Sequence, residues 1–184
     1  MNLFRRSSTH TSTAAKLFAV TCVVAAALPL SVSAQDLPAR KAGLWQITTN
    51  GTTGTTKNPE QVMQQCVDTA SDQALQKMGA GMMNNMKCEK NENKKDGGKY
   101  TGHSICQMGP SKLETKSVTS GDFEKEYTMT ADSTFNPPMS GISTTKSTMV
   151  AKWVGPCKAD QKPGDVMVNG QKMNLLNMGQ APKK

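Results

Sequence analysis

The sequence has few aromatic residues and no long apolar run after residue 30. Aromatic residues make up 4% of the 184-residue chain, so it lacks the repeated rings on which single-stranded nucleic acids stack. A transmembrane helix needs about 20 consecutive apolar residues, and no stretch of that length occurs. We therefore expect neither nucleic-acid binding nor a membrane-spanning segment.

The sequence also lacks the residue sets that mark common active sites. It has two histidines, and one of them, His103, lies beyond the N-terminal region. No Ser, His and acid set stands at a recognised signature, and no Gly-x-Ser-x-Gly nucleophile elbow is present. The cysteines form no Cys-x-x-Cys pair that would suggest a metal site. We predict no catalytic residues, no cysteine metal site and no cofactor, with His103 exposed on a strand.

The first 34 residues have the composition of an export signal. A segment with Arg5, Arg6 and Lys16 but no acidic residue leads into an apolar run from Leu17 to Leu30. Small residues then occupy the cleavage positions up to Ala34, as in a secretory signal peptide. We predict a signal peptide over 1–34, cleavage after Ala34, and a periplasmic or secreted mature protein that begins at Gln35.

Two other export routes are less well supported. Lipidation at Cys22 would require a small residue before it, but Thr21 stands there and the apolar run continues past it. A twin-arginine signal at Arg5-Arg6 lacks the apolar residue expected shortly afterwards. General secretory export remains the preferred interpretation.

The charge of the mature chain is mildly positive. Three of the 22 basic residues lie in the predicted signal, so 19 basic residues face 14 acidic ones, a net charge of +5. The lysines are scattered, which is typical of a solvated surface. Binding to a polyanion or an anionic lipid surface is the alternative.

Four cysteines in the mature chain predict two disulfides in an oxidising compartment. Asp96-Gly97-Gly98 indicates a hairpin between strands at 86–92 and 99–108. A three-residue loop centred on Gly97 places Cys88 opposite Cys106, whereas a two-residue Asp96-Gly97 turn would not, so the loop must be odd or bulged. Of the three possible pairings we favour Cys88 with Cys106, which leaves Cys66 for Cys157.

The rest of the chain favours an antiparallel sheet. Alternation predicts half-buried strands, and a capping box at Thr69 to Asp72 predicts a helix over 73–78 that ends at Gly79. The segment 62–67 is ambiguous, because Asn58-Pro59 resembles a helix start, but we prefer a strand. The other strands are expected at 44–49, 113–119, 123–131 and 144–153.

The predicted fold class is α+β, mainly antiparallel β. We expect a single curved meander sheet of about six strands with one short helix, stapled by two disulfides. The secreted domain is predicted to span 35–157, followed by a loosely held tail over 158–184 that is rich in Lys, Gly and Asn. A small hairpin over 166–173 is an alternative within that tail.

Several short motifs together resemble a known bacterial secreted family. Gly43-Leu44-Trp45 opens the domain, Cys66-Val67 precedes the helix, and Gly155-Pro156-Cys157 closes it. In this order, from Arg40 to Cys157, the chain resembles the family called domain of unknown function 3617. Gln46 stands where that family commonly has Glu. The resemblance implies a periplasmic or secreted domain with an antiparallel sheet, and brings no activity or site residue.

Three classes of function remain open. The leading hypothesis is a non-enzymatic extracytoplasmic module whose open sheet face binds a small apolar ligand, an envelope component or a protein. The alternative is a copper(I)-binding protein, because thioethers are soft ligands; Gly79 and Gly81 interrupt the helix that would align them, and Met is also an ordinary core filler. The third is an enzyme of unknown type. The candidate copper ligands are Met78, Met82, Met83 and Met86.

Overall fold

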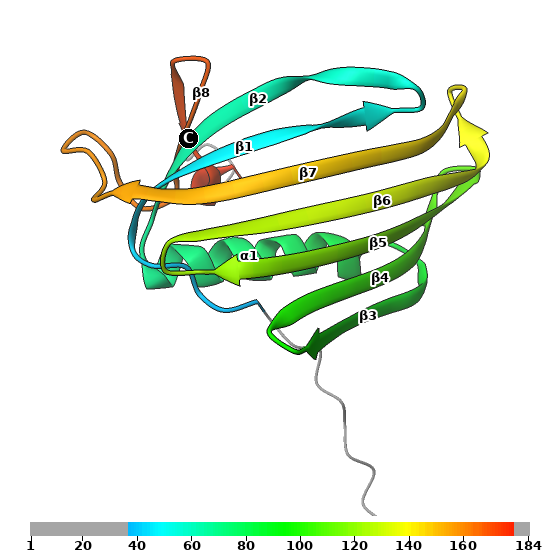
Figure 1. The fold of residues 1–184 in the computed structure, drawn as a ribbon, viewed down its shortest axis with the longest axis horizontal. Helices are drawn as coiled ribbons and strands as arrows, with labels where there is room; N and C mark the ends of the chain where they lie inside the picture. The colour runs from blue at the N-terminus through cyan, green and yellow to red at the C-terminus, as the bar shows by residue number, and fades with distance from the viewer. Residues whose placement is uncertain (1–36, 179–184) are drawn as a thin grey trace, which may run out of the picture. The chain divides into compact units, whose positions relative to one another are not determined.

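The computed structural model describes residues 37–178, and the predicted signal peptide at 1–34 lies outside them. Within this range the chain forms one nine-stranded antiparallel sheet, one α-helix and a short 3-10 helix (Figure 1). The elements are β1 (Gly43–Thr53), β2 (Thr56–Val67), α1 (Thr69–Asn84), β3 (Cys88–Asp96), β4 (Lys99–Met108), β5 (Ser111–Asp122), β6 (Glu126–Met139), β7 (Ile142–Gly155), β8 (Asp165–Val168), β9 (Gln171–Asn174) and η1 (Leu175–Asn177).

The strand order is β3-β4-β5-β6-β7-β1-β2-β8-β9. Strands β3 to β7 form a meander, and β7 then pairs with β1, the first strand of the domain. The mainly antiparallel class with one α-helix and two disulfides is confirmed, but the expectation of about six strands is wrong. The strands absent from the expected set are β8 and β9, which lie in the segment predicted to be a tail and join the sheet by backbone pairing of β8 with β2.

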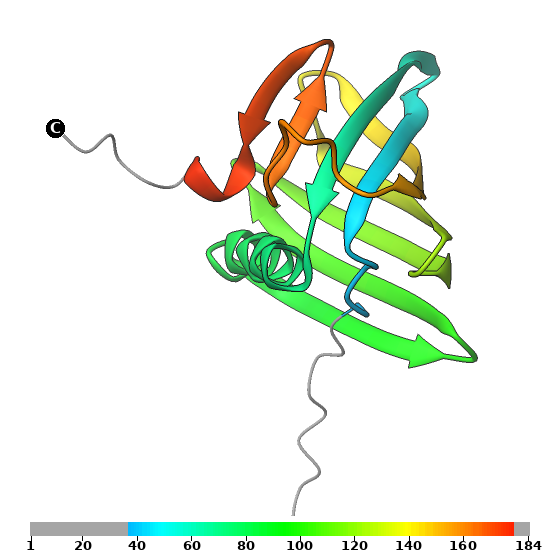
Figure 2. The ribbon, with the colours of Figure 1, turned by 90° about the vertical axis from the view of Figure 1, so that its left-hand side faces the viewer.

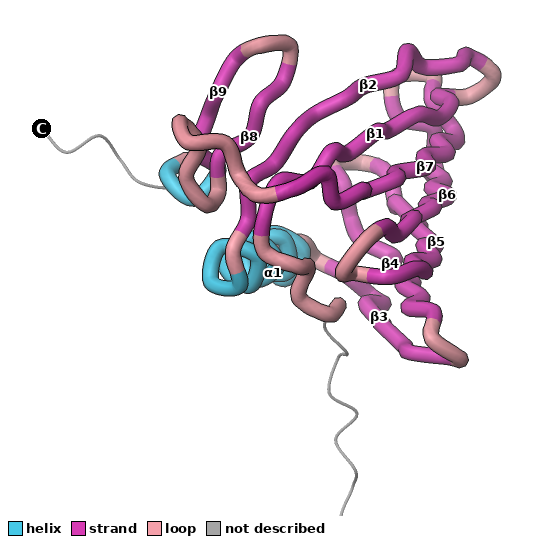
Figure 3. The backbone as a smooth tube through the Cα atoms, turned by 60° about the vertical axis from the view of Figure 1, so that its left-hand side comes forward, coloured by secondary structure: helices cyan, strands magenta, loops and turns pink. Residues whose placement is uncertain are grey.

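The sheet is curved, and α1 lies on its concave side (Figures 2 and 3). A row of small residues crosses this inner face at one register and leaves room for the curvature. A Cβ at Gly51 would overlap the carbonyl oxygen of Lys146, and β1 carries a bulge at this point. Glycines and bulges are the usual means of bending a sheet. The row comprises Gly102, Ser117, Ala131, Ser147 and Gly51.

The core is concentrated near one end of this inner face. Trp45 and Ile47 alternate along β1 and are buried together with Val67, Tyr127 and Ala151. The Trp45 and Tyr127 ring centroids lie 5.7 Å apart, a separation favourable for aromatic pairs. The strands therefore bury one face and leave the other wet, as expected for an antiparallel sheet.

Helix α1 begins earlier and ends later than the sequence predicts. The N-cap is Asp68, not Thr69: its Oδ1 accepts from the Ser71 N–H at 2.7 Å, and the Asp68 N–H donates to Ser71 Oγ at 2.8 Å. These bonds from Ser71 lower the pKa of Asp68. The helix also continues through Gly79 and Gly81 to Asn84, so the predicted end at Gly79 is wrong. Each glycine costs a helix about 1 kcal/mol, and Leu75, before the glycines, packs against the core of the sheet.

Two disulfides join Cys88 to Cys106 and Cys66 to Cys157, the pairs that the sequence favours. The turn between β3 and β4 is not the predicted three-residue loop. It consists of Gly97 and Gly98, both with positive φ, as a two-residue hairpin turn requires. A bulge at Glu89 then restores the pairing of Cys88 with Cys106, so the bulged alternative is the one that occurs.

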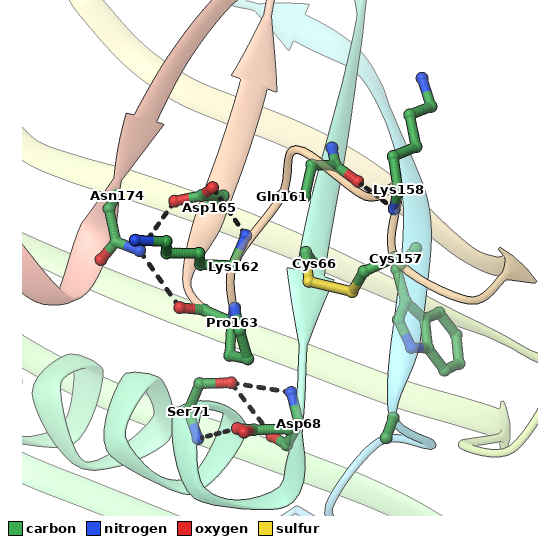
Figure 4. Close-up of a disulfide and its surroundings, with 12 residues drawn as sticks. Cys66, Asp68, Ser71, Cys157, Lys158, Gln161, Lys162, Pro163, Asp165 and Asn174 are labelled. Atoms are coloured by element: carbon green, nitrogen blue, oxygen red, sulfur yellow. Dashed lines mark hydrogen bonds between the residues drawn. A yellow bond between two sulfur atoms is a disulfide. The ribbon is translucent and has the colours of Figure 1, made fainter.

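Residues after Cys157 are not a loose tail over the described part of the chain. The hairpin of β8 and β9 pairs with β2 and extends the sheet, as in the alternative noted above. Figure 4 shows the turn that precedes it, in which the Lys162 N–H donates to Asp165 Oδ2 at 2.9 Å. This bond and one from Asn174 lower the pKa of Asp165. These local polar contacts and the buried Val166 together hold this segment against the sheet.

Candidate ligand-binding cleft

A cleft of about 340 Å³ lies between α1 and the inner face of the sheet. Its walls come from the helix, from the central strands and from the segment that precedes β1. Most of the lining side chains are apolar, and many are only partly covered by protein atoms. The apolar lining residues are Leu37, Pro38, Ile47, Leu75, Met78, Met82, Phe123, Met149 and Leu175, with Gly79 among them.

One stripe of α1 faces the cleft. The lining helix residues Asp72, Leu75, Gly79 and Met82 follow one another at intervals of three or four, which places them on one side of a helix. A Cβ at Gly79 would meet no atom within 4 Å. The stripe is polar in the first helical turn and apolar further along.

A buried ion pair occupies the polar end of the cleft. The Asp72 side chain is 1% exposed, and the Arg40 side chain is 10% exposed. Asp72 Oδ1 accepts from Arg40 Nε at 2.8 Å and lies 2.7 Å from Nη2, while Oδ2 accepts from the Arg40 backbone N–H at 2.8 Å. The pair joins the segment before β1 to the first turn of α1.

Two glutamines and a tyrosine complete this polar end. Arg40 Nη1 donates to Gln65 Oε1 at 3.0 Å, and Gln76 Nε2 donates to Asp72 Oδ2 at 3.2 Å. Burial raises the pKa of Tyr127, and the nearby Arg40 partly opposes this shift. The sequence alone does not predict this network. One signal was present: Asp72 lies on the same helical stripe as the apolar Leu75.

The structure separates the predicted site residues. Met78 and Met82 both line the cleft, whereas Met86 lies beyond the end of α1 and the side chain of Met83 lies outside the described part. The four cysteines of the described range are all in disulfides. Among the described residues, no group of three or more His, Cys, Asp or Glu side chains forms a metal site.

His103 lies on the outer face of the sheet, opposite to the cleft. Its Nε2 is 2.9 Å from Glu114 Oε1. Glu114 also pairs with Lys116 at 3.0 Å, and hydrogen bonds from Lys116 first, then from His103, lower its pKa. His103 is therefore part of a partly exposed cluster of polar contacts with Glu114 at its centre.

A second hollow, of about 600 Å³, lies near the hairpin of β1 and β2. Its lining is polar and carries both signs of charge, with Lys57 and Glu60 among the residues. No apolar side chain apart from Pro59 lines it in the described residues. It lacks the apolar walls that ligand pockets usually have.

The motifs at the two ends of the domain meet in space. Gly155 pairs with Leu44 next to Gly43, and Trp153 pairs with Trp45. A Cβ at Gly43 would lie 2.5 Å from the Gly155 carbonyl oxygen and 2.5 Å from Trp153 Nε1. Trp153 Nε1 donates to the Ala42 carbonyl at 3.1 Å. The opening and closing motifs therefore hold β1 and β7 together where these two strands pair. Their role is structural.

Within residues 37–178, no helix has the length and apolar character needed to cross a membrane. A search of curated proteins found no match, and a search of solved structures found none either. A family model described as "Protein of unknown function (DUF3617)" matches residues 40–157, from the arginine of the buried ion pair to the last cysteine. The chain therefore belongs to the DUF3617 family.

Proposed function

We propose that this protein is a periplasmic or secreted, non-enzymatic module that binds a small apolar molecule in the cleft between α1 and the sheet. The observation that carries the proposal is the cleft itself. Ligand pockets typically occupy about 300–1,000 Å³ and combine apolar walls with a few well-placed polar groups. At about 340 Å³, with its polar groups at one end, the cleft fits the lower part of that range.

The inner face of the sheet supports this proposal because much of it is incompletely covered. Met63 and Met149 pack at the edge of the core and are only partly buried. Beyond them the face carries small side chains such as Ala131 and Ser147. A bound apolar chain would cover this surface and remove it from water, which stabilises by about 25 cal/mol per Å² of apolar area.

The extracytoplasmic location is supported by the basic and apolar N-terminal sequence and by the two disulfides. Structural disulfides persist in oxidising compartments. N-terminal sequencing of the exported protein should begin at Gln35. A mature protein that retains the first 34 residues, or that carries four free thiols, would contradict this part of the proposal.

The cleft can be tested by filling it. Gly79→Leu places a side chain on the cleft-facing stripe, at a position where a Cβ meets open space. Gly81→Leu is the matched control, because Gly81 lies about 200° further round the helix, also meets open space and does not line the cleft. Both changes raise helix propensity, so both variants should fold.

The probe is Nile red, an uncharged dye whose fluorescence rises in apolar surroundings. We expect the wild-type protein and Gly81→Leu to bind it equally, and Gly79→Leu to bind it at least about tenfold more weakly, a change of about 1.4 kcal/mol. Equal binding by the two variants would mean that the dye occupies another surface and would refute the proposal.

Copper(I) binding is a second candidate, because the structure removes the objection raised by the glycines. Helix α1 is continuous through Gly79 and Gly81, so Met78 and Met82 lie four residues apart on one side of it. The test is a copper(I) titration of a variant with Met78, Met82 and Met86 replaced by Leu. Met173→Leu, on β9, is the control. Unchanged affinity in the triple variant would exclude this site.

A further inference from the structure

The two charged residues that line the cleft neutralise each other. Arg40 and Asp72 are the only charged side chains among the described residues of its lining. Arg40 Nε and Nη2 both contact Asp72 Oδ1, and the Arg40 backbone N–H occupies Oδ2. The pair is nearly fully buried. The cleft therefore has no net formal charge.

Neither partner of this pair is free to meet a charged ligand. Asp72 Oδ2 also accepts from Gln76, and Arg40 Nη1 donates to Gln65. A carboxylate placed here would have to displace Asp72 from Arg40, and an ammonium group would have to displace Arg40 from Asp72. Either exchange leaves one charge buried without a partner, which is strongly unfavourable.

Charged side chains instead gather on the outer face of the sheet. Lys146 pairs with Asp132 at 3.0 Å, and Lys152 lies 3.7 Å from Glu126. These pairs alternate along β6 and β7 with Ala131 and Ala151, which face inward. The net positive charge of the chain therefore lies outside the cleft, whose two charged residues cancel.

We propose that the cleft selects an uncharged amphiphile: an apolar chain that ends in hydroxyl or ester groups, as in a neutral lipid. The chain would lie along Leu75 and Met82, and its polar end would lie near the amides of Gln65 and Gln76. Asp72 and Met82 are ten residues apart, which corresponds to about 15 Å along the helix. This inference rests on the proposed function and adds the chemistry of the ligand.

The test compares three probes that share one apolar chain and differ in head-group charge. Monolaurin is neutral, laurate is anionic and dodecyltrimethylammonium is cationic; each displaces Nile red at concentrations below self-assembly and at neutral pH. For the wild-type protein we expect monolaurin to displace the dye at a concentration at least about tenfold lower than either charged probe, because a tenfold ratio corresponds to only 1.4 kcal/mol.

Asp72→Asn removes the charge that compensates Arg40. In this variant the affinity for laurate relative to that for monolaurin should rise at least about tenfold, because the laurate carboxylate then has a buried cation, Arg40, to pair with. Asp132→Asn is the control, since it removes an acid of the same kind from an outer-face ion pair. Its order of probe affinities should match that of the wild-type protein.

Laurate binding as tightly as monolaurin in the wild-type protein would overturn the inference. The inference would also be overturned if a folded Asp72→Asn variant bound the three probes in the same order of affinity as the wild-type protein. If that variant does not fold, the double variant Arg40→Gln, Asp72→Asn replaces it: with both charges removed it should keep the wild-type order, and a changed order would refute the inference. Failure of Nile red to bind the wild-type protein, or equal binding by Gly79→Leu, would instead refute the proposed function.

Discussion

The disulfide between Cys66 and Cys157 should contribute more to stability than the one between Cys88 and Cys106. The first closes 91 residues and the second 18. In the chain-entropy treatment, a disulfide destabilises the unfolded state in proportion to the logarithm of the closed loop. This gives about 4.6 kcal/mol for the long bridge and about 3.2 kcal/mol for the short one at 25 °C.

The native surroundings make this comparison a fair test. Replacing Cys66 and Cys157 by Ala leaves β1 paired with both β2 and β7, so no strand loses its neighbour. The Gly164 N–H still donates to the Cys66 carbonyl at 2.9 Å, because a backbone oxygen is the acceptor. The loss should therefore arise mainly in the unfolded chain, and should exceed that of the Cys88→Ala, Cys106→Ala variant by about 1.4 kcal/mol.

The assay is urea unfolding of the oxidised wild-type protein and of the two double variants, followed by tryptophan fluorescence, since Trp45 is fully buried. A domain of this size usually has only about 5–15 kcal/mol of stability, so both losses are large enough to measure. An equal or greater loss in the Cys88→Ala, Cys106→Ala variant would show that the chain-entropy argument does not govern this fold.

Three further predictions concern capping, packing and pH. Asp68→Ala should lower the free energy of unfolding by about 1 kcal/mol in urea, whereas Thr69→Ala, outside the observed capping box, should cost less than half as much. Gly43→Ala should cost more than about 2 kcal/mol, because its Cβ would lie 2.5 Å from the Gly155 oxygen and its φ is 134°; a smaller loss would show that the two strands separate easily. Folding lowers the pKa values of Asp68 and Asp165 below 3.8, so their stabilisation is present above that pH and lost as the pH falls through the folded values. Asp165→Asn should weaken the dependence of stability on pH below about 3.8, as measured by urea unfolding at several pH values; an unchanged dependence would contradict it.

Cysteine spacing and turn residues were sufficient to predict the β3 and β4 hairpin. Cys88 and Cys106 stand at nearly equal distances from a Gly-Gly turn, so either an odd loop or a bulge brings them together. The sequence did not distinguish these two solutions, because a bulge at an exposed, charged residue such as Glu89 has no local signature. Both solutions nevertheless give the same disulfide.

The extent of α1 was not predictable from local signals. Glycine frequently terminates a helix, so the sequence predicts that the helix ends at Gly79. The helix nevertheless continues to Asn84, and Leu75, one turn before the glycine, packs against the core of the sheet. Such packing depends on strands far away in the sequence, so a local pattern does not report it.

The polar end of the cleft depends on even longer separations. Arg40 and Asp72 are 32 residues apart, and Arg40 and Gln65 are 25 apart. Nothing near Arg40 in the sequence distinguishes it from a solvated basic residue before the first strand. Only the topology, which places the start of β1 beside the end of β2, brings these groups together.

The positions of the two disulfides determine how α1 is anchored. Cys66 lies just before α1 and Cys88 just after it, and each is bonded to another part of the sheet. The strand residues that flank the helix on either side are therefore cross-linked to more distant parts of the sheet. Both ends of the helix that forms one wall of the cleft are thus anchored covalently as well as by strand pairing.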